Sequence, residues 1–183
     1  LAAGFWNSEK NTLFLDLGTN GEIVLGNQDW MVTCACSAGP AFEGGEISCG
    51  MRAAMGAIDK IFIDRNSLKP SYKIIGDIKP KGICGSGLID IIAEMFLSGI
   101  IDRRGKLMLT IKSDRVRYNS NMGCSEYVVV FGKESYDGRD IAINEVDIDN
   151  FLRAKGAVYS GIRTLLNSVG LDMSNIDQVI IAG

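Results

Sequence analysis

The first strong pattern in the chain is an apolar run at residues 13–17, which is interrupted only by Asp16. Apolar side chains at successive positions point to both faces of a strand, so this run predicts a strand in the middle of a sheet. A two-residue turn, Asn20-Gly21, is predicted next, because Asn-Gly is the strongest short signal for a β-hairpin. A second strand up to Leu25 and a third at residues 30–36 follow. The pattern predicts an antiparallel meander.

Two helices are predicted further along the chain. Residues 88–97 are apolar almost all round, with Asp90 and Glu94 as the only polar stripe, which predicts a buried helix with one solvated edge. From residue 148 to residue 169, apolar residues recur at spacings of three and four, which predicts an amphipathic helix. Asn144 and Asp147 resemble a capping box at its start.

The remaining apolar runs predict strands at residues 57–63, 72–75, 126–131, 141–143 and 179–181. Residues 102–123 are predicted to be a polar, irregular excursion. The order of the elements predicts an α/β fold with a mixed sheet and helices packed on it. The length allows one domain with a sizeable core, so we expect a single domain over residues 1–183 with an insertion near residues 98–125.

Charge and composition narrow the classes of function. The net charge is −3 without a basic run, which argues against nucleic acid or a membrane surface as the main partner. No apolar run is long enough to span a bilayer. The odd number of cysteines, five, favours reduced thiols and a cytoplasmic protein. The absence of histidine excludes Ser-His and Cys-His catalysis and most catalytic zinc sites.

The predicted hairpin holds the best candidate for chemistry. A carboxylate inside a buried strand is costly unless a cation, a water or hydrogen-bond donors lie beside it, and Asp16 stands in such a strand. Gly18, Thr19, Asn20 and Gly21 follow it, and backbone N–H groups in a glycine-rich turn can converge on an anion. This combination suits a nucleotide phosphate with a hydrated metal. The alternative is a core hairpin in which Asp16 caps its own turn.

Glycines elsewhere leave two further alternatives open. The loop at residues 82–87 runs straight into a helix, so it is either an anion site at a helix N-terminus or a tight loop that lets the helix pack closely on a sheet. Gly156 and Gly161 stand inside the predicted long helix, where glycine is unfavourable. They indicate a close approach either of a nucleotide or of a neighbouring element of the core.

Several separated segments, in order, resemble one group of the ASKHA superfamily, which comprises acetate and sugar kinases, heat-shock chaperones and actin. The group is the ATP-dependent reductive activators of corrinoid proteins. The similar segments are residues 16–26 (DLGTNGEIVLG), 36–45 (CSAGPAFEGG), 49–54 (CGMRAA), 82–90 (GICGSGLID) and 154–157 (AKGA).

This resemblance implies a ribonuclease H-like fold and an activator that returns Co(II) corrinoid to Co(I) for methyl transfer, with ATP and magnesium as cofactors. Asp16 would be the catalytic residue and would hold a magnesium-bound water. Gly18, Thr19, Asn20 and Gly21 would face the phosphates. The helix through Gly156 resembles the connecting helix of the superfamily, and Ala182 and Gly183 resemble the start of the adenosine segment.

The resemblance also implies partners and further parts. The partner would be a corrinoid protein or a corrinoid methyltransferase, and a homodimer of the intact protein stays open. The chain has no second Asp-x-Gly-Thr segment and no Cys-x-x-Cys pattern, so we expect the iron–sulfur cluster of the family outside this chain. The chain also lacks an initiator methionine and ends on an apolar strand. We therefore expect an excised second half of a nucleotide-binding domain, inactive by itself, within an ATPase.

Two other functions remain as alternatives. The chain could be a docking module for the corrinoid protein, with residues 102–123 and the cations Arg103 and Arg104 as its surface. It could also belong to a kinase of the same superfamily that acts on a small molecule, although no substrate acid or base beyond Asp16 is recognisable.

Overall fold

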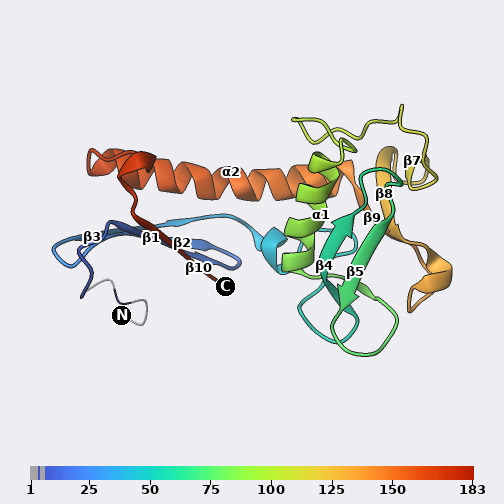
Figure 1. The fold of residues 1–183 in the computed structure, drawn as a ribbon, viewed down its shortest axis with the longest axis horizontal. Helices are drawn as coiled ribbons and strands as arrows, with labels where there is room; N and C mark the ends of the chain where they lie inside the picture. The colour runs from blue at the N-terminus through green and yellow to red at the C-terminus, as the bar shows by residue number, and fades with distance from the viewer. Residues whose placement is uncertain (1–3, 5–6) are drawn as a thin grey trace. The chain divides into compact units, whose positions relative to one another are not determined.

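Two compact units make up the structure, a computed structural model that describes Gly4 and residues 7–183 (Figure 1). Unit 1 combines Leu1–Pro40 with Arg153–Gly183, and unit 2 is Ala41–Leu152. Helix α2 (Glu145–Ser168) continues through the boundary between them. Residues 1–3, 5 and 6 of the predicted domain lie outside the described part of the chain.

Unit 1 is built on a mixed sheet with the strand order β10-β1-β2-β3. Strands β1 (Thr12–Leu17), β2 (Gly21–Gly26) and β3 (Met31–Cys36) form the predicted antiparallel meander, which is confirmed. Strand β10 (Gln178–Ala182) lies parallel to β1. The short 3-10 helix η4 (Met173–Asn175) precedes it and is capped by the side chain of Asp172.

The α2 helix covers one face of this sheet. A Cβ atom on Gly161 would lie 2.7 Å from Cδ1 of Ile23 and 3.5 Å from Cβ of Cys36, so helix and sheet approach closely there. Most of the apolar residues predicted to recur at three and four along the helix are buried, which confirms its amphipathic pattern. The buried ones are Ile148, Phe151, Val158, Ile162, Leu165 and Leu166, whereas Leu152 and Val169 of the predicted stripe are half-buried.

Unit 2 contains two further sheets and a helix. One sheet has the order β5-β4-β6, with β4 (Ala57–Ile63), β5 (Pro70–Ile74) and β6 (Gly82–Ile83). The other has the order β7-β8-β9, with β7 (Val116–Asn119), β8 (Cys124–Val130) and β9 (Ile141–Asn144). Helix α1 (Gly85–Leu97) lies against β4. The 3-10 helices η2 (Pro40–Glu43) and η3 (Gly132–Glu134) lie in connections.

The polar stripe of α1 has a different role from the predicted one. Asp90 and Glu94 accept hydrogen bonds from the backbone N–H groups of Ile61 (3.2 Å) and Ile63 (2.9 Å). They therefore cover the edge of β4 beyond the point where β6 ends. The prediction of a buried helix whose one solvated edge is Asp90 and Glu94 is therefore wrong, since Ile89, Phe96 and Leu97 are exposed instead. Composition alone does not reveal which side of a uniformly apolar helix meets a sheet.

The predicted excursion at residues 102–123 is more ordered than its composition indicates. Asp102 accepts backbone hydrogen bonds from Arg104 and Lys106, and Ile101 pairs with Leu107 across this turn. Strand β7 also lies inside this range, which corrects the prediction of an irregular segment. The sequence pattern did not predict this strand because its side chains are polar: Arg117 pairs with a carboxylate of β8 rather than with apolar residues.

None of the helices in the described ranges is long and apolar enough to cross a membrane.

Candidate functional site

Asp16 lies near the carboxyl end of β1, in a central position of the unit 1 sheet. It is in register with Glu22 of β2 on one side and with Ala182 of β10 on the other. Its neighbours Leu13 and Leu15 are buried and in register with Leu25 and Ile23, which form the face that α2 covers. Because side chains alternate along a strand, Asp16 points to the opposite face.

The carboxylate of Asp16 is half-buried and forms no hydrogen bond or ion pair with any residue that the structure describes. The turn after it is closed instead by the backbone, because the N–H of Gly18 donates to the carbonyl of Asn20 at 3.0 Å. The alternative in which Asp16 caps its own turn is therefore wrong. Its oxygens remain available to an external group.

The turn itself differs from the predicted two-residue Asn-Gly turn. Gly21 is the first residue of β2 and pairs with Leu17, so the connection consists of Gly18, Thr19 and Asn20. A Cβ atom on Gly21 would lie 2.6 Å from the sulfur of Cys36 and 3.4 Å from Cγ2 of Val158. Close packing of β3 and α2, rather than a positive φ, thus requires glycine at position 21.

The end of β10 lies beside the same turn. Gly183 has a φ of 119°, and its Cβ position is filled by the carbonyl oxygen of Leu17, so only glycine allows the chain to pass there. The parallel pairing of β1 and β10 thus brings Asp16, the turn and Ala182-Gly183 to one end of the sheet. These residues are far apart in the sequence, and the arrangement groups most of the predicted site residues.

Gly156 is the remaining predicted site residue. It is exposed on the part of α2 that belongs to unit 1, and a Cβ atom there would meet nothing within 4 Å. Val158, two residues further along, reaches Gly21. The surface at Gly156 is thus open, and its predicted contact with a nucleotide stays a prediction.

The residues at this end of the sheet fit a magnesium-bound phosphate group. Magnesium prefers oxygen ligands and is commonly held by one or two carboxylates together with phosphates and waters. Asp16 offers carboxylate oxygens that no described protein group occupies. The glycines at 18 and 183 let backbone approach a ligand closely. Among residues 4 and 7–183 there is no group of three or more His, Cys, Asp and Glu residues that could hold a metal ion.

The glycine loop before α1 is used for packing. A Cβ atom on Gly85 would collide with the carbonyl oxygen of Phe42, and one on Gly87 with the carbonyl oxygen of Ile58. The N–H of Cys84 donates to the same carbonyl of Ile58 at 3.1 Å. This geometry supports the packing alternative for residues 82–87, because other backbone segments lie where a Cβ atom of Gly85 or Gly87 would be.

Sequence reasoning missed a polar pocket in unit 2. It has a volume of about 190 Å³ and is lined in part by Arg117, which contacts Glu126 (2.7 Å) and Asp140 (2.6 Å). Burial lowers the pKa of Arg117, but the hydrogen bonds to these carboxylates outweigh burial and raise it. The signal in the sequence was the pattern of charged residues in β7 and β8. Further lining residues are Ser48, Cys49, Asn119, Met122, Ala142 and Asn144.

A second buried network adjoins this pocket at the start of α2. Asp147 accepts hydrogen bonds from the backbone N–H and the hydroxyl of Ser48, both at 2.7 Å, and from the N–H of Asn144. The side chain of Asn144 accepts from the N–H of Asp147 in return, which confirms the predicted capping box. Burial, followed by the charge of Asp147, raises the pKa of the Cys49 thiol.

Comparison with known proteins gives consistent results. The family model of the C-terminal domain of RACo, the ASKHA domain, matches residues 10–183. The "corrinoid activation enzyme RamQ" of Eubacterium limosum is 35% identical over 185 residues, which cover 98% of this chain and 31% of that protein. The "[Co(II) methylated amine-specific corrinoid protein] reductase" of Methanosarcina barkeri is 27% identical over 208 residues, covering 100% of this chain and 33% of that protein.

A solved structure is also similar. The "reductive activator for corrinoid, iron-sulfur protein" superimposes with a TM-score of 0.92 at 52% sequence identity, over 99% of this chain and 28% of that one. The chain thus spans about a third or less of the length of each of these relatives. The predicted ribonuclease H-like α/β fold is confirmed by the family model and by this structure.

Proposed function

Because the chain belongs to the family of the C-terminal ASKHA domain of RACo, we propose that it supplies one wall of the ATP cleft in a longer activator. This activator reduces the Co(II) corrinoid of a partner protein to Co(I), which restores the capacity for methyl transfer. The names of the similar proteins support this proposal, since they describe corrinoid activation and reduction. The observation that carries it is the unpaired Asp16 beside the glycine-containing turn and the end of β10.

Each residue of the candidate site has a role in this proposal. Asp16 holds a water of the magnesium ion that accompanies the nucleotide. The backbone of Gly18, Thr19, Asn20 and Gly21 lies along the phosphates, and Ala182 and Gly183 begin the adenosine segment, with Gly156 on the nearby helix. Bound magnesium neutralises charge on the phosphates. The protein contributes orientation, through a carboxylate fixed between two paired strands.

Other parts of the activator lie outside this chain in the proposal. The iron–sulfur cluster that delivers the electron belongs to another domain, and ATP binding or hydrolysis drives the uphill reduction. The corrinoid protein or a corrinoid methyltransferase is the partner, and the intact protein works in the cytoplasm. In this proposal the chain contributes contacts to the nucleotide and has no activity by itself.

Visible absorption of the corrinoid tests the proposal, because Co(II) and Co(I) have different spectra. The intact activator, its reductant, magnesium-ATP and the corrinoid, iron–sulfur protein are mixed, and formation of Co(I) is followed. We expect Asp16→Ala to abolish ATP-dependent reduction. Asp29→Ala is the matched control, since Asp29 is an exposed aspartate in the turn between β2 and β3. Equal rates for both variants would contradict the proposed role of Asp16.

The docking-module alternative keeps one specific observation in its favour. Arg103 and Arg104 are exposed. The carboxylate of Asp102 beside them accepts hydrogen bonds from backbone N–H groups of its own turn. The ordered turn therefore presents two cations to solvent.

A further inference from the structure

The outward face of the β4–β5 hairpin carries an exposed aromatic residue between lysines. Lys60 is in register with Lys73, and Phe62 is in register with Ser71. All four side chains are exposed, and Phe62 retains 56% of its accessible surface. We call this set of four residues the hairpin face. Lys69, also exposed, stands at the end of the hairpin next to it.

The inward face of β4 and its edge toward α1 are already occupied. Ile61 and Ile63 of β4 point inward and are buried. The carboxylates of Asp90 and Glu94 on α1 take up the backbone N–H groups along the edge of β4. A partner therefore cannot extend the sheet at this edge by adding a strand, and the hairpin face is the side of β4 that is left for it.

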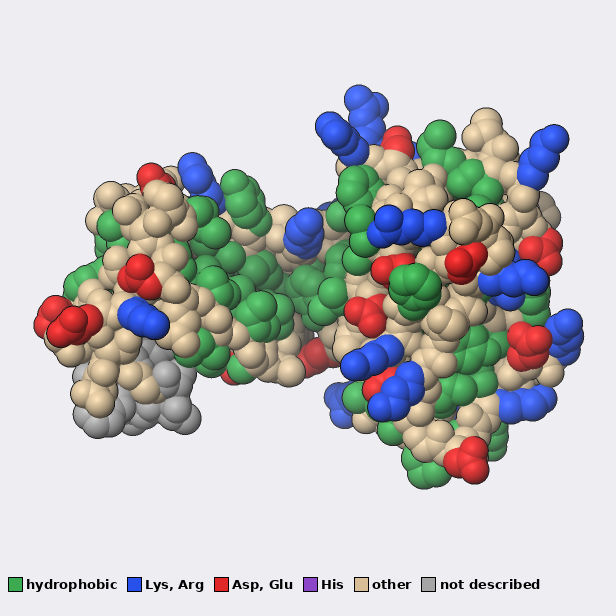
Figure 2. Space-filling view, in the orientation of Figure 1, with side chains coloured by type: hydrophobic (Ala, Val, Ile, Leu, Met, Phe, Trp, Pro, Cys, Tyr) green, Lys and Arg blue, Asp and Glu red, His purple; other side chains and the backbone are tan. Residues whose placement is uncertain are grey.

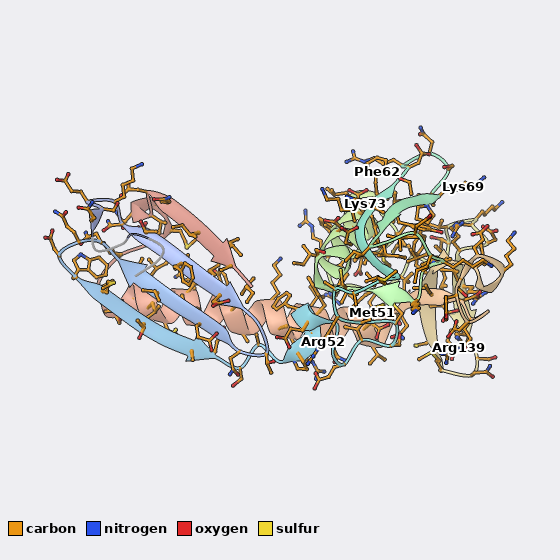
Figure 3. The ribbon with its side chains drawn as sticks, turned by 90° about the horizontal axis from the view of Figure 1, so that it is seen from below. Met51, Arg52, Phe62, Lys69, Lys73 and Arg139 are labelled. Atoms are coloured by element: carbon orange, nitrogen blue, oxygen red, sulfur yellow. The ribbon has the colours of Figure 1, made fainter. Side chains whose placement is uncertain are left out.

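The charges on the hairpin face are unbalanced. Like charges directly opposite each other on neighbouring strands are destabilising, and Lys60 faces Lys73 in this way. Within the described residues, no carboxylate lies within ion-pair distance of Lys60, Lys69 or Lys73. Figure 3 shows Phe62, Lys69 and Lys73 on the hairpin side of unit 2, away from Met51, Arg52 and Arg139. In Figure 2, blue cationic side chains are spread over unit 2 with apolar side chains among them.

We propose that the hairpin face docks an acidic protein surface that presents an apolar side chain at its centre. Carboxylates of such a partner would offset the repulsion between Lys60 and Lys73, and Phe62 would be the buried aromatic anchor. Interfaces commonly combine an aromatic anchor in the middle with a charged rim. Complementary charge also increases the rate of association.

A protein fits this face better than a nucleic acid or a membrane. A single aromatic side chain stacks on one base only, whereas strands of nucleic acid are bound along a basic groove with several aromatic residues. The whole chain carries a net charge of −3, which disfavours the general electrostatic attraction on which binding of a polyanion depends. The inference rests on the proposed function, in which the partner is the corrinoid protein.

Binding of the corrinoid, iron–sulfur protein to the intact activator tests this surface. Affinities are measured by calorimetric titration for the wild type, for Lys60→Glu combined with Lys73→Glu, and for Phe62→Ser. We expect the double variant to bind about tenfold more weakly or worse, and Phe62→Ser to lose about tenfold. Binding of magnesium-ATP and the circular dichroism spectrum are expected to be unchanged, because these side chains are exposed and belong to unit 2.

Arg103→Glu combined with Arg104→Glu is the matched control, because it changes the net charge equally. We expect it to weaken binding by less than about threefold, as is usual for charges outside an interface. A larger loss in this control than in the lysine variant, or equal losses in both, would overturn the proposal. The proposal would also be overturned if the lysine variant bound the corrinoid protein with wild-type affinity. It would likewise be overturned if the lysine variant lost binding to anionic vesicles or to single-stranded RNA instead of to the corrinoid protein. A wild type that does not bind the corrinoid protein would overturn the proposed function itself, and the hairpin face with it.

Discussion

The carboxylate of Glu94 on α1 accepts a hydrogen bond from the backbone N–H of Ile63 on β4 at 2.9 Å. One helical turn earlier, Asp90 does the same for Ile61. A helix thus replaces the missing neighbour of a strand through its side chains. Edge strands with open N–H groups are prone to unwanted pairing, and this arrangement removes that hazard.

We expect Glu94→Ala to lower the free energy of unfolding by about 1–3 kcal/mol, since it leaves the N–H of a buried residue without its acceptor. Glu94→Gln retains an acceptor oxygen and is expected to lose much less. Urea denaturation of both variants measures the difference. Equal stability of Glu94→Ala and the wild type would show that water replaces the carboxylate without cost.

The glycines of α2 are expected to respond differently to alanine. Gly156→Ala meets open space, so it should stabilise the helix by about 1 kcal/mol through helix propensity. Gly161→Ala places a methyl group 2.7 Å from Cδ1 of the buried Ile23, and overpacking of this kind typically costs about 1–3 kcal/mol. Thermal denaturation of the two variants should therefore rank Gly161→Ala below Gly156→Ala. The reverse order would contradict the close packing of α2 on β2.

Gly156→Ala also tests its proposed place beside the nucleotide. If the nucleotide lies against this part of α2, the variant binds magnesium-ATP more weakly although the protein is more stable. Calorimetric titration of the intact protein separates these two effects. Unchanged affinity would remove Gly156 from the proposed site and leave the remaining residues in place.

The stability of the chain is expected to fall in alkaline solution. Burial and the charge of Asp147 raise the pKa of Cys49 above its ordinary value of 9.0. The thiol then ionises more readily in the unfolded chain, so this contribution to stability is fully present below about pH 9 and is lost as the pH rises further. The slope is at most about 1.4 kcal/mol per pH unit for one group. Burial likewise raises the pKa of Tyr127, which adds to the loss above about pH 10.

Urea denaturation between pH 8 and pH 10.5 measures this dependence. Cys49→Ala should flatten it, because the variant has no thiol to ionise. Cys84→Ala serves as a control at another cysteine in unit 2, one whose removal leaves the Cys49 thiol in place. If Cys49→Ala and the wild type lose stability equally with pH, Cys49 is not the group responsible.

We propose that the two units unfold together as the single domain predicted from the sequence. Helix α2 continues from unit 2 into unit 1, so loss of either unit removes support from part of the same helix. Fluorescence of Trp30 reports on unit 1, and far-ultraviolet circular dichroism reports on both units. Coincident transitions are expected in urea. Separate transitions would identify two domains instead.

The sequence predicted those elements whose periodicity matched their burial. The meander and the apolar stripe of α2 belong to this class, because apolar residues such as Leu13, Leu15 and Val158 stand at the positions that are buried in the structure. The role of Asp90 was not predictable, since its partner is a backbone group distant in the sequence. Strand β7 was missed because its Arg117 pairs with carboxylates and so looks like a solvated residue.

The candidate site was partly predictable for a similar reason. Asp16 was conspicuous as a charge in an apolar strand, and the turn after it followed from its glycines. The sequence pattern placed Gly21 in the turn, although its pairing with Leu17 and Cys36 makes it part of β2. The approach of Gly183 to Leu17 depends on parallel pairing of strands at opposite ends of the chain, which no local pattern encodes.

The proposed nucleotide site is tested by calorimetric titration of magnesium-ATP into the intact protein. The wild type, Asp16→Ala and the control Asp29→Ala are compared. The proposed site predicts that Asp16→Ala loses binding by about tenfold or more, because the carboxylate that holds the hydrated magnesium is gone. Asp29→Ala should bind like the wild type. Unchanged affinity of Asp16→Ala would make the hairpin a purely structural element and would place the nucleotide elsewhere.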